Sequence, residues 1–207
     1  MDRSDDGVRR AGQERIELVL ALDGLTVTTS LKEFSPHFGL NGLSISYSSG
    51  AVEISGAFLK IAEMSFAGAA LIKAKAFTLS AIGGYTKVGG HPSLFIYAVL
   101  EYPIGGPSFF FVTGLAGGFG YNRSLLMPDI AGVKDFPLIK EVLAGAGMPD
   151  DLNEELLSLS KYIPPTVGES FFAAGIKFNS FKLVDSFALL AVSFGKHFEV
   201  DVLGIST

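Results

Sequence analysis

The chain contains no cysteine and no tryptophan, and only three of its 207 residues are histidine. Without cysteine there can be no disulfide framework, no thiolate metal site and no cysteine nucleophile. Charged residues make up only 18% of the chain, and acidic residues outnumber basic ones by 21 to 16. The resulting net charge of −5 argues against a nucleic-acid-binding protein, which needs a basic surface.

Apolar residues are abundant instead. Hydrophobic residues make up 48% of the chain, which also holds 18 phenylalanines and 25 glycines. This composition excludes a disordered chain, and a chain of this length can bury a core without metals or disulfides. We expect a charged, disordered tail over residues 1–15 and a single β-rich domain over residues 16–207. No apolar stretch of signal-peptide length follows a basic start, so no signal peptide is recognised.

The longest uncharged stretch, residues 102–122, is long enough to cross a bilayer as a helix. It carries Pro103, Pro107 and six glycines, which break helices. We therefore predict a turn followed by a strand here and no transmembrane helix. Membrane association through strands, and the cellular compartment, stay open.

Alternation of apolar and other residues predicts strands along most of the chain. Asp23-Gly24 between two alternating runs, residues 16–22 and 25–31, predicts a first hairpin. A second hairpin is expected over residues 43–61. The remaining predicted strands are one long strand over 65–82, then 94–102, 108–121, and three antiparallel strands over 171–181, 187–194 and 197–205.

Helical spacing appears only between residues 128 and 163. Asp151 with Glu154 three residues later is typical of a helix start, and Pro164-Pro165 ends the pattern. The predicted fold is therefore mainly β: a curled antiparallel sheet or open barrel with a helical insertion near 128–163 that packs across the sheet.

Several predicted strands are apolar on both of their faces, in contrast to a half-exposed sheet, which alternates. They are residues 66–82, 94–102 and 108–121. Leaving a second apolar face in water is costly, because each buried large side chain contributes roughly 1.5–3 kcal/mol. We expect both faces to be covered: by the helices, by curling of the sheet, by neighbouring domains or by an apolar ligand.

Six residues are the candidates for a surface that binds an apolar ligand or a partner: Phe95, Tyr97, Phe109, Phe111, Phe119 and Arg123. Arg123 is the most polar point after a long apolar run. It either anchors an anionic head group beside an apolar groove or pairs with a carboxylate at a sheet edge.

Signals for catalysis are weak. His197, Glu199 and Asp201 alternate along one strand face, which suits a metal or acid–base cluster but is much more typical of a solvated outer face. The glycine-rich residues 114–120 lack the Lys-Ser/Thr ending of a phosphate loop and no helix follows them at once. We therefore predict no catalytic residue, no metal and no cofactor.

Short motifs in the second half of the chain carry a resemblance to a known family. The motifs are Gly118-Phe119-Gly120-Tyr121-Asn122-Arg123, Pro128, residues 135–138, 171–181, 184–190 and 203–207. In these motifs the sequence is similar to large bacterial and fungal proteins that carry the domain of unknown function 6603, and the resemblance is best over about residues 110–207. It implies no activity that could be transferred, and it suggests that the chain is a piece of a longer protein.

Three functions follow as expectations. The first is a non-enzymatic structural or interaction module of a larger β-rich protein, with other domains of the same or another protein as partners. The second is a carrier of a lipid or other apolar ligand in a groove of the curled sheet. The third is a hydrolase that uses His197 with Glu199 or Asp201.

Overall fold

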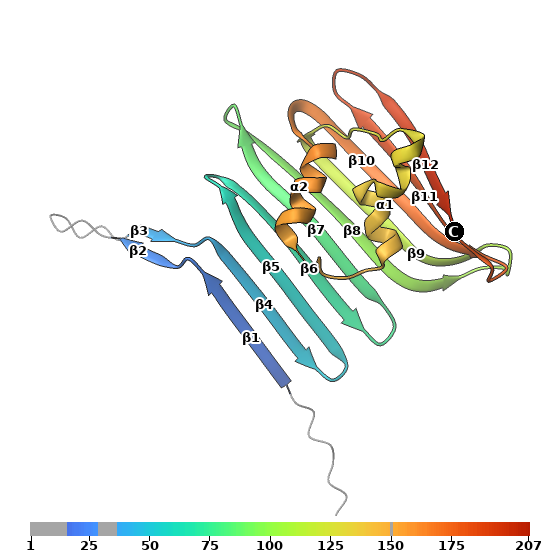
Figure 1. Cartoon of the computed structure of the whole chain (residues 1–207), viewed down its shortest axis with the longest axis horizontal. Helices are drawn as coiled ribbons and strands as arrows, with labels where there is room; N and C mark the ends of the chain where they lie inside the picture. The colour runs from blue at the N-terminus through green and yellow to red at the C-terminus, as the bar shows by residue number, and fades with distance from the viewer. Residues whose placement is uncertain (1–15, 29–36, 150) are drawn as a thin grey trace, which may run out of the picture.

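The computed structural model describes residues 16–28, 37–149 and 151–207. The tail predicted over residues 1–15 lies outside them. Ten strands form one antiparallel sheet in the order β1-β4-β5-β6-β7-β8-β9-β10-β11-β12 (Figure 1). The mainly β prediction is confirmed. The strands of this sheet are β1 (Ile16–Asp23), β4 (Gly42–Ser49), β5 (Val52–Ala62), β6 (Ser65–Ala74), β7 (Thr78–Val88), β8 (His91–Gly105), β9 (Phe111–Arg123), β10 (Pro165–Ser180), β11 (Val184–Phe194) and β12 (Glu199–Ser206).

The sheet is open, with β1 and β12 as its two edges. From β4 onward each strand pairs with the next one along the chain, so the sheet grows by hairpins in a single direction. The link between β9 and β10 is the long one, and it carries the helices. The sheet therefore has two large faces, each of which must be considered separately.

The first predicted hairpin is wrong, although both of its alternating runs begin as strands. β1 pairs along its whole length with β4, from Ile16 opposite Ser49 to Asp23 opposite Gly42. The short strand β2 (Thr26–Thr28) instead pairs with β3 (His37–Gly39) in a separate two-stranded sheet (Figure 1). Alternation identifies a strand but not its partner. β1 pairs with β4 over eight residues, whereas β2 is only three residues long. The rest of the run to residue 31 lies outside the described residues.

The long strand predicted over residues 65–82 is two strands, β6 and β7, joined by a tight turn. The amide of Ala74 donates to the carbonyl oxygen of Phe77 at 2.9 Å. The buried positions change from odd numbers in β6 to even numbers in β7. No glycine or proline marks the turn, so period-two alternation alone could not reveal it. The second hairpin, β4 with β5, and the remaining strands are confirmed.

The helical insertion predicted near 128–163 is confirmed. It contains a 3-10 helix, η1 (Ile130–Asp135), and two α-helices, α1 (Pro137–Ala144) and α2 (Leu152–Tyr162). The carboxylate of Asp151 caps α2 by accepting from the amides of Asn153 and Glu154. The helices lie on one face of the sheet (Figure 1), and their contacts reach from β6 to β12. The core between helices and sheet is apolar and fully buried; it includes Phe136, Leu138, Ile139, Leu159, Ile163 and Leu189.

Glycines on the helix side make room for aromatic rings. A side chain at Gly84 would meet the ring of Phe95, and one at Gly120 would meet the ring of Phe171. Each ring belongs to the residue that pairs with the glycine on the neighbouring strand, and it extends over that glycine. Tyr97 lies over Gly118 in the same manner. The glycine-rich residues 114–120 are thus part of strand β9, where they let rings lie flat on the sheet.

Candidate functional site

The face of the sheet opposite the helices carries large apolar side chains on nearly every strand, and the described chain leaves it uncovered. Leu20 on β1 is 60% exposed, Ile96 on β8 is 51% exposed and Phe172 on β10 is 54% exposed. Leu115, Leu190 and Val202 extend the same surface across β9, β11 and β12. We call this surface the uncovered face.

The expectation that both faces are shielded is therefore wrong for this chain alone. The helices all lie on one side, and the sheet does not close on itself. A protein surface normally exposes scattered apolar side chains, whereas a large contiguous apolar patch marks an interaction site. The uncovered face is such a patch.

Strand β4 shows that the sequence treats the two faces differently. β4 lies beyond the region that the helices cover (Figure 1). Its helix-side positions are Ser44, Ser46 and Ser48, but its positions on the uncovered face include Leu43 and Ile45. Where the helix side is open to water the strand is polar, and on the opposite side it remains apolar. Both faces of β4 lack a covering helix, yet only one of them is apolar. The apolar side chains of the uncovered face therefore need another explanation.

Small residues form a straight trough across the middle of the uncovered face. The strand registers place them directly opposite one another on six neighbouring strands, β5 to β10. We call this row the trough; it consists of Gly56, Ala70, Ala81, Ala98, Gly117 and Ala174. All six are glycine or alanine, so none is charged and no side chain in the trough is larger than a methyl group.

A row of branched aliphatic side chains borders the trough on one side. Each member lies two residues from the trough member of its own strand, and we call the row the aliphatic ridge. It consists of Ile54, Ile72, Leu79, Leu100, Leu115 and Ile176. A second row borders the trough on its other side and contains Phe58, Gly68, Gly83, Ile96, Phe119 and Phe172. The uncovered face is therefore apolar and also uneven, because a row of small residues lies beside a row of large ones. We call this unevenness the relief of the face.

The second row contains a hollow. A shallow, open depression of about 390 Å³ is lined by residues of β5 to β8, including Phe58, Phe66, Gly68, Gly83 and Ile96. The rings of Phe58 and Phe66 stack with centroids 5.2 Å apart at one side. Across the sheet, the ring of Phe172 lies between those of Phe119 and Phe194, at 5.0 and 5.6 Å. Apolar contact is the chemistry that these groups offer.

The structure separates the six residues predicted as one surface. Phe95 and Tyr97 are buried at 6% and 2% exposure beneath the helices, and Arg123 is buried at 5%. These three belong to the packed core and not to an open surface. Phe109 and Phe111 are exposed at the β8–β9 end of the sheet. Only Phe119 lies within the uncovered face.

Arg123 serves the fold. Its Nη1 donates to the carbonyl oxygen of Ile163 at 2.9 Å, and its guanidinium lies 5.1 Å from the ring centre of Phe95. Burial lowers the pKa of Arg123 to about 10. Among the described residues no carboxylate lies within ion-pair distance of it. The expected head-group anchor or edge ion pair is thus replaced by a contact that fastens the end of α2 to the sheet.

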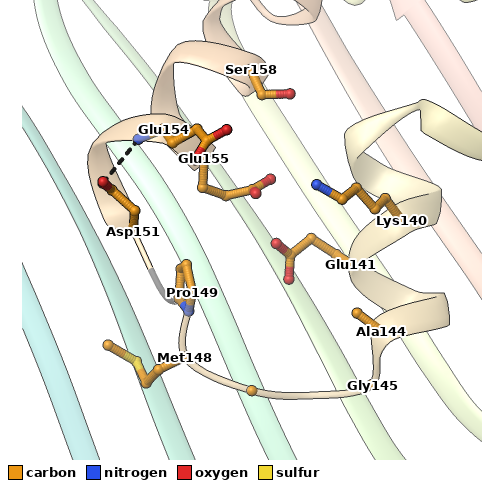
Figure 2. Close-up of a pocket in the computed structure, with 11 residues that line it drawn as sticks. Lys140, Glu141, Ala144, Gly145, Met148, Pro149, Asp151, Glu154, Glu155 and Ser158 are labelled. Atoms are coloured by element: carbon orange, nitrogen blue, oxygen red, sulfur yellow. Dashed lines mark hydrogen bonds between the residues drawn. The ribbon is translucent and has the colours of Figure 1, made fainter.

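An acidic pocket of about 420 Å³ lies between α1 and α2 (Figure 2). Glu141 on α1 and Glu155 on α2 face one another there, with Lys140 beside them (Figure 2). Burial, and then the neighbouring Glu155, raise the pKa of Glu141 to about 7. Burial also raises the pKa of Tyr97, whose hydroxyl donates to the carbonyl oxygen of Leu138 at 2.7 Å. Sequence reasoning missed Glu141, because its partner lies on a different helix.

His197, Glu199 and Asp201 lie at the edge of the sheet, in and just before β12. His197 and Glu199 are exposed. No group of three histidine, aspartate or glutamate residues suited to a metal ion occurs among residues 16–28, 37–149 and 151–207. In the same described part of the chain, no helix combines the length and apolar character needed to span a membrane.

Comparison with known proteins gives a family but no activity. The model of a family of unknown function, DUF6603, matches residues 14–207, which is nearly the whole chain. The chain belongs to this family, as the motifs between residues 110 and 207 suggested, and the match extends well before them. No curated protein and no solved structure matches the chain.

Proposed function

We propose that this chain is a non-enzymatic interaction module that associates with another protein surface through the uncovered face. The observation that carries the proposal is the contrast on β4, where serines face water on the helix side and Leu43 and Ile45 occupy the opposite side. A strand that is polar on one open face and apolar on the other supports a covered role for the apolar face.

The energetics support the same role. Burying a large apolar side chain contributes roughly 1.5–3 kcal/mol. The uncovered face presents many such side chains at 40–74% exposure, among them Phe58, Ile96, Phe172 and Val202. Because these side chains are only about half exposed, each contributes roughly half of that value when a partner covers it. Burial of most of them is therefore comparable to the entropy cost of association, about 4–15 kcal/mol.

Sedimentation velocity of the chain over a range of concentrations, together with a hydrophobic dye, tests the proposal. We expect self-association or dye binding by the wild-type chain, and loss of both in an Ile96→Thr, Phe172→Ser double variant that still unfolds in one cooperative transition. The control is Leu157→Ser, which removes a side chain that is 71% exposed on α2, away from the uncovered face. A wild-type chain that stays monomeric and binds no dye refutes the proposal.

The second candidate is a carrier of an apolar molecule. The hollow of about 390 Å³ beside Gly68 and Gly83 favours it, because its lining is apolar and its floor is glycine. Native mass spectrometry of the chain after incubation with a fatty acid tests this function. We expect a one-to-one adduct that Ala70→Phe abolishes, because Ala70 lines the hollow and a ring at this position fills it. An adduct that survives this change argues against the site.

A further inference from the structure

We propose that the partner surface is a second copy of this chain, with the two uncovered faces packed against each other as a sandwich. This inference rests on the proposed function and names the partner for the same surface. In the sandwich the trough of each copy receives the aliphatic ridge of the other.

The size of the face suits a dimer. Ten strands about 4.8 Å apart span about 45 Å, and three side-chain rows about 6.8 Å apart add roughly 20 Å in the other direction. The projected area is therefore roughly 900 Å² per copy. A stable protein interface buries about 800 Å² per partner, so the face is large enough even when the twist of two stacked sheets reduces their overlap.

The charge pattern also favours an identical partner. The trough and both rows beside it contain no charged residue, so two copies meet without like-charge repulsion. Lys60 and Lys87 share the parity of this face but lie near strand ends, outside these three rows. A net charge of −5 for the chain disfavours an anionic membrane as the covering surface.

The relief of the face is complementary to itself. On each of β5 to β10 a small residue of the trough is separated by one residue from a large residue of the aliphatic ridge, as in Ala98 and Leu100 on β8. A twofold axis that runs across the strands between these two rows places Ala98 opposite Leu100 of the second copy, and Leu100 opposite its Ala98. The same exchange holds for Ala81 with Leu79 on β7. Two-fold dimers have this reciprocal form of contact.

The first test fills the trough with apolar atoms. Ala98→Phe increases the apolar area of the face but prevents entry of the opposing ridge. We expect the dimer dissociation constant measured by sedimentation equilibrium to rise at least 100-fold, with the melting temperature of the monomer unchanged. Leu157→Phe on the outer side of α2 is the matched control. Equal or tighter association of Ala98→Phe overturns the ridge-in-trough arrangement.

The second test uses the reciprocal contact, in which Ala98 of each copy lies opposite Leu100 of the other. Ala98→Asp and Leu100→Lys each place a charge against an apolar residue of an identical partner, and each variant alone is expected to be monomeric. In a mixture, the new carboxylate at position 98 faces the new ammonium at position 100 of the other variant, and the second contact of the dimer is native. We expect the mixture to form a heterodimer. Because the chain has no cysteine, a single cysteine placed on the helix side can carry a fluorophore to detect it.

The outcomes separate this inference from the proposed function. Rescue of association in the mixture supports both. Association of the wild-type chain without rescue, or assembly into species other than a dimer, overturns the twofold sandwich and leaves the interaction module standing. A wild-type chain that remains monomeric overturns the sandwich. If that monomer also binds no hydrophobic dye, the interaction module is refuted as well, and if it takes up fatty acid on the uncovered face, the carrier is favoured instead.

Discussion

Gly120 and Gly117 on strand β9 lie three residues apart but face opposite sides of the sheet, and alanine at each should have opposite effects. A side chain at Gly120 would lie 2.6 Å from Cδ1 of Phe171, whose ring is 1% exposed. Around Gly117 there is nothing within 4 Å of a new methyl group. Neither glycine has the positive φ that would itself disfavour alanine.

The magnitudes follow from these surroundings. Gly120→Ala overpacks a close-packed layer, which costs about 1–3 kcal/mol in free energy of unfolding. Gly117→Ala restricts the unfolded chain without strain in the folded one, which stabilises by about 0.4–1 kcal/mol. For a chain of this length 1 kcal/mol corresponds to about 2–4 °C in melting temperature. We therefore expect the two variants to melt on opposite sides of the wild type.

Urea denaturation followed by far-ultraviolet circular dichroism measures both free energies, and the unfolding slope checks that the transition is unchanged. Gly120→Ala with Phe171→Leu provides a further control, because a smaller side chain at 171 should relieve part of the overlap. If Gly120→Ala is as stable as Gly117→Ala, the rings do not lie on the glycines and the assignment of the two faces fails.

Three further predictions concern other parts of the chain. Phe187→Ala should cost about 3–5 kcal/mol because its ring is 1% exposed. Phe172→Ala should cost only about 1–2 kcal/mol, because its side chain is 54% exposed and the change mainly removes the contacts with the rings of Phe119 and Phe194; chemical denaturation compares the two. Asp151→Ala should cost about 1 kcal/mol by removing the cap of α2, and Asp151→Asn should restore most of it. The folded chain holds the proton of Glu141 more tightly than the unfolded chain does, so the stability that this group contributes should be complete below about pH 4.5 and fall by about 1–2 kcal/mol as the pH rises through 7. Glu141→Gln should flatten that dependence in melting curves recorded from pH 4 to 8, and an unaltered slope would contradict the shifted pKa.

Much of the secondary structure could be predicted from alternation. β4 with β5, and β8 to β12, follow from period-two patterns, and α2 follows from the cap at Asp151 and its apolar stripe. The prediction failed where the alternation of residues along one strand does not show which strand it pairs with or where it turns. The first hairpin was assigned to neighbouring runs, but β1 found a longer partner in β4. The turn between β6 and β7 lacks glycine and proline, so it was read as continuous strand.

The candidate surface was harder to predict. Phe95 and Tyr97 are aromatic residues in a strand that is apolar on both faces. Their odd-numbered positions show that they share a face, but the sequence does not show which face the helices cover. Strands β6 and β9 each contain several small residues. Their alignment into one trough depends on the registers of six strands, which no single strand contains.

By itself, the sequence determined that the chain is a β protein with a helical insertion, because side-chain alternation and helix caps act over a few residues. It also determined that both faces of several strands are apolar. Only the tertiary structure decided that the helices cover one face, that the other stays open, and that small and large residues align across it in rows. Those properties depend on strand order and register, which arise from contacts between residues far apart in the chain.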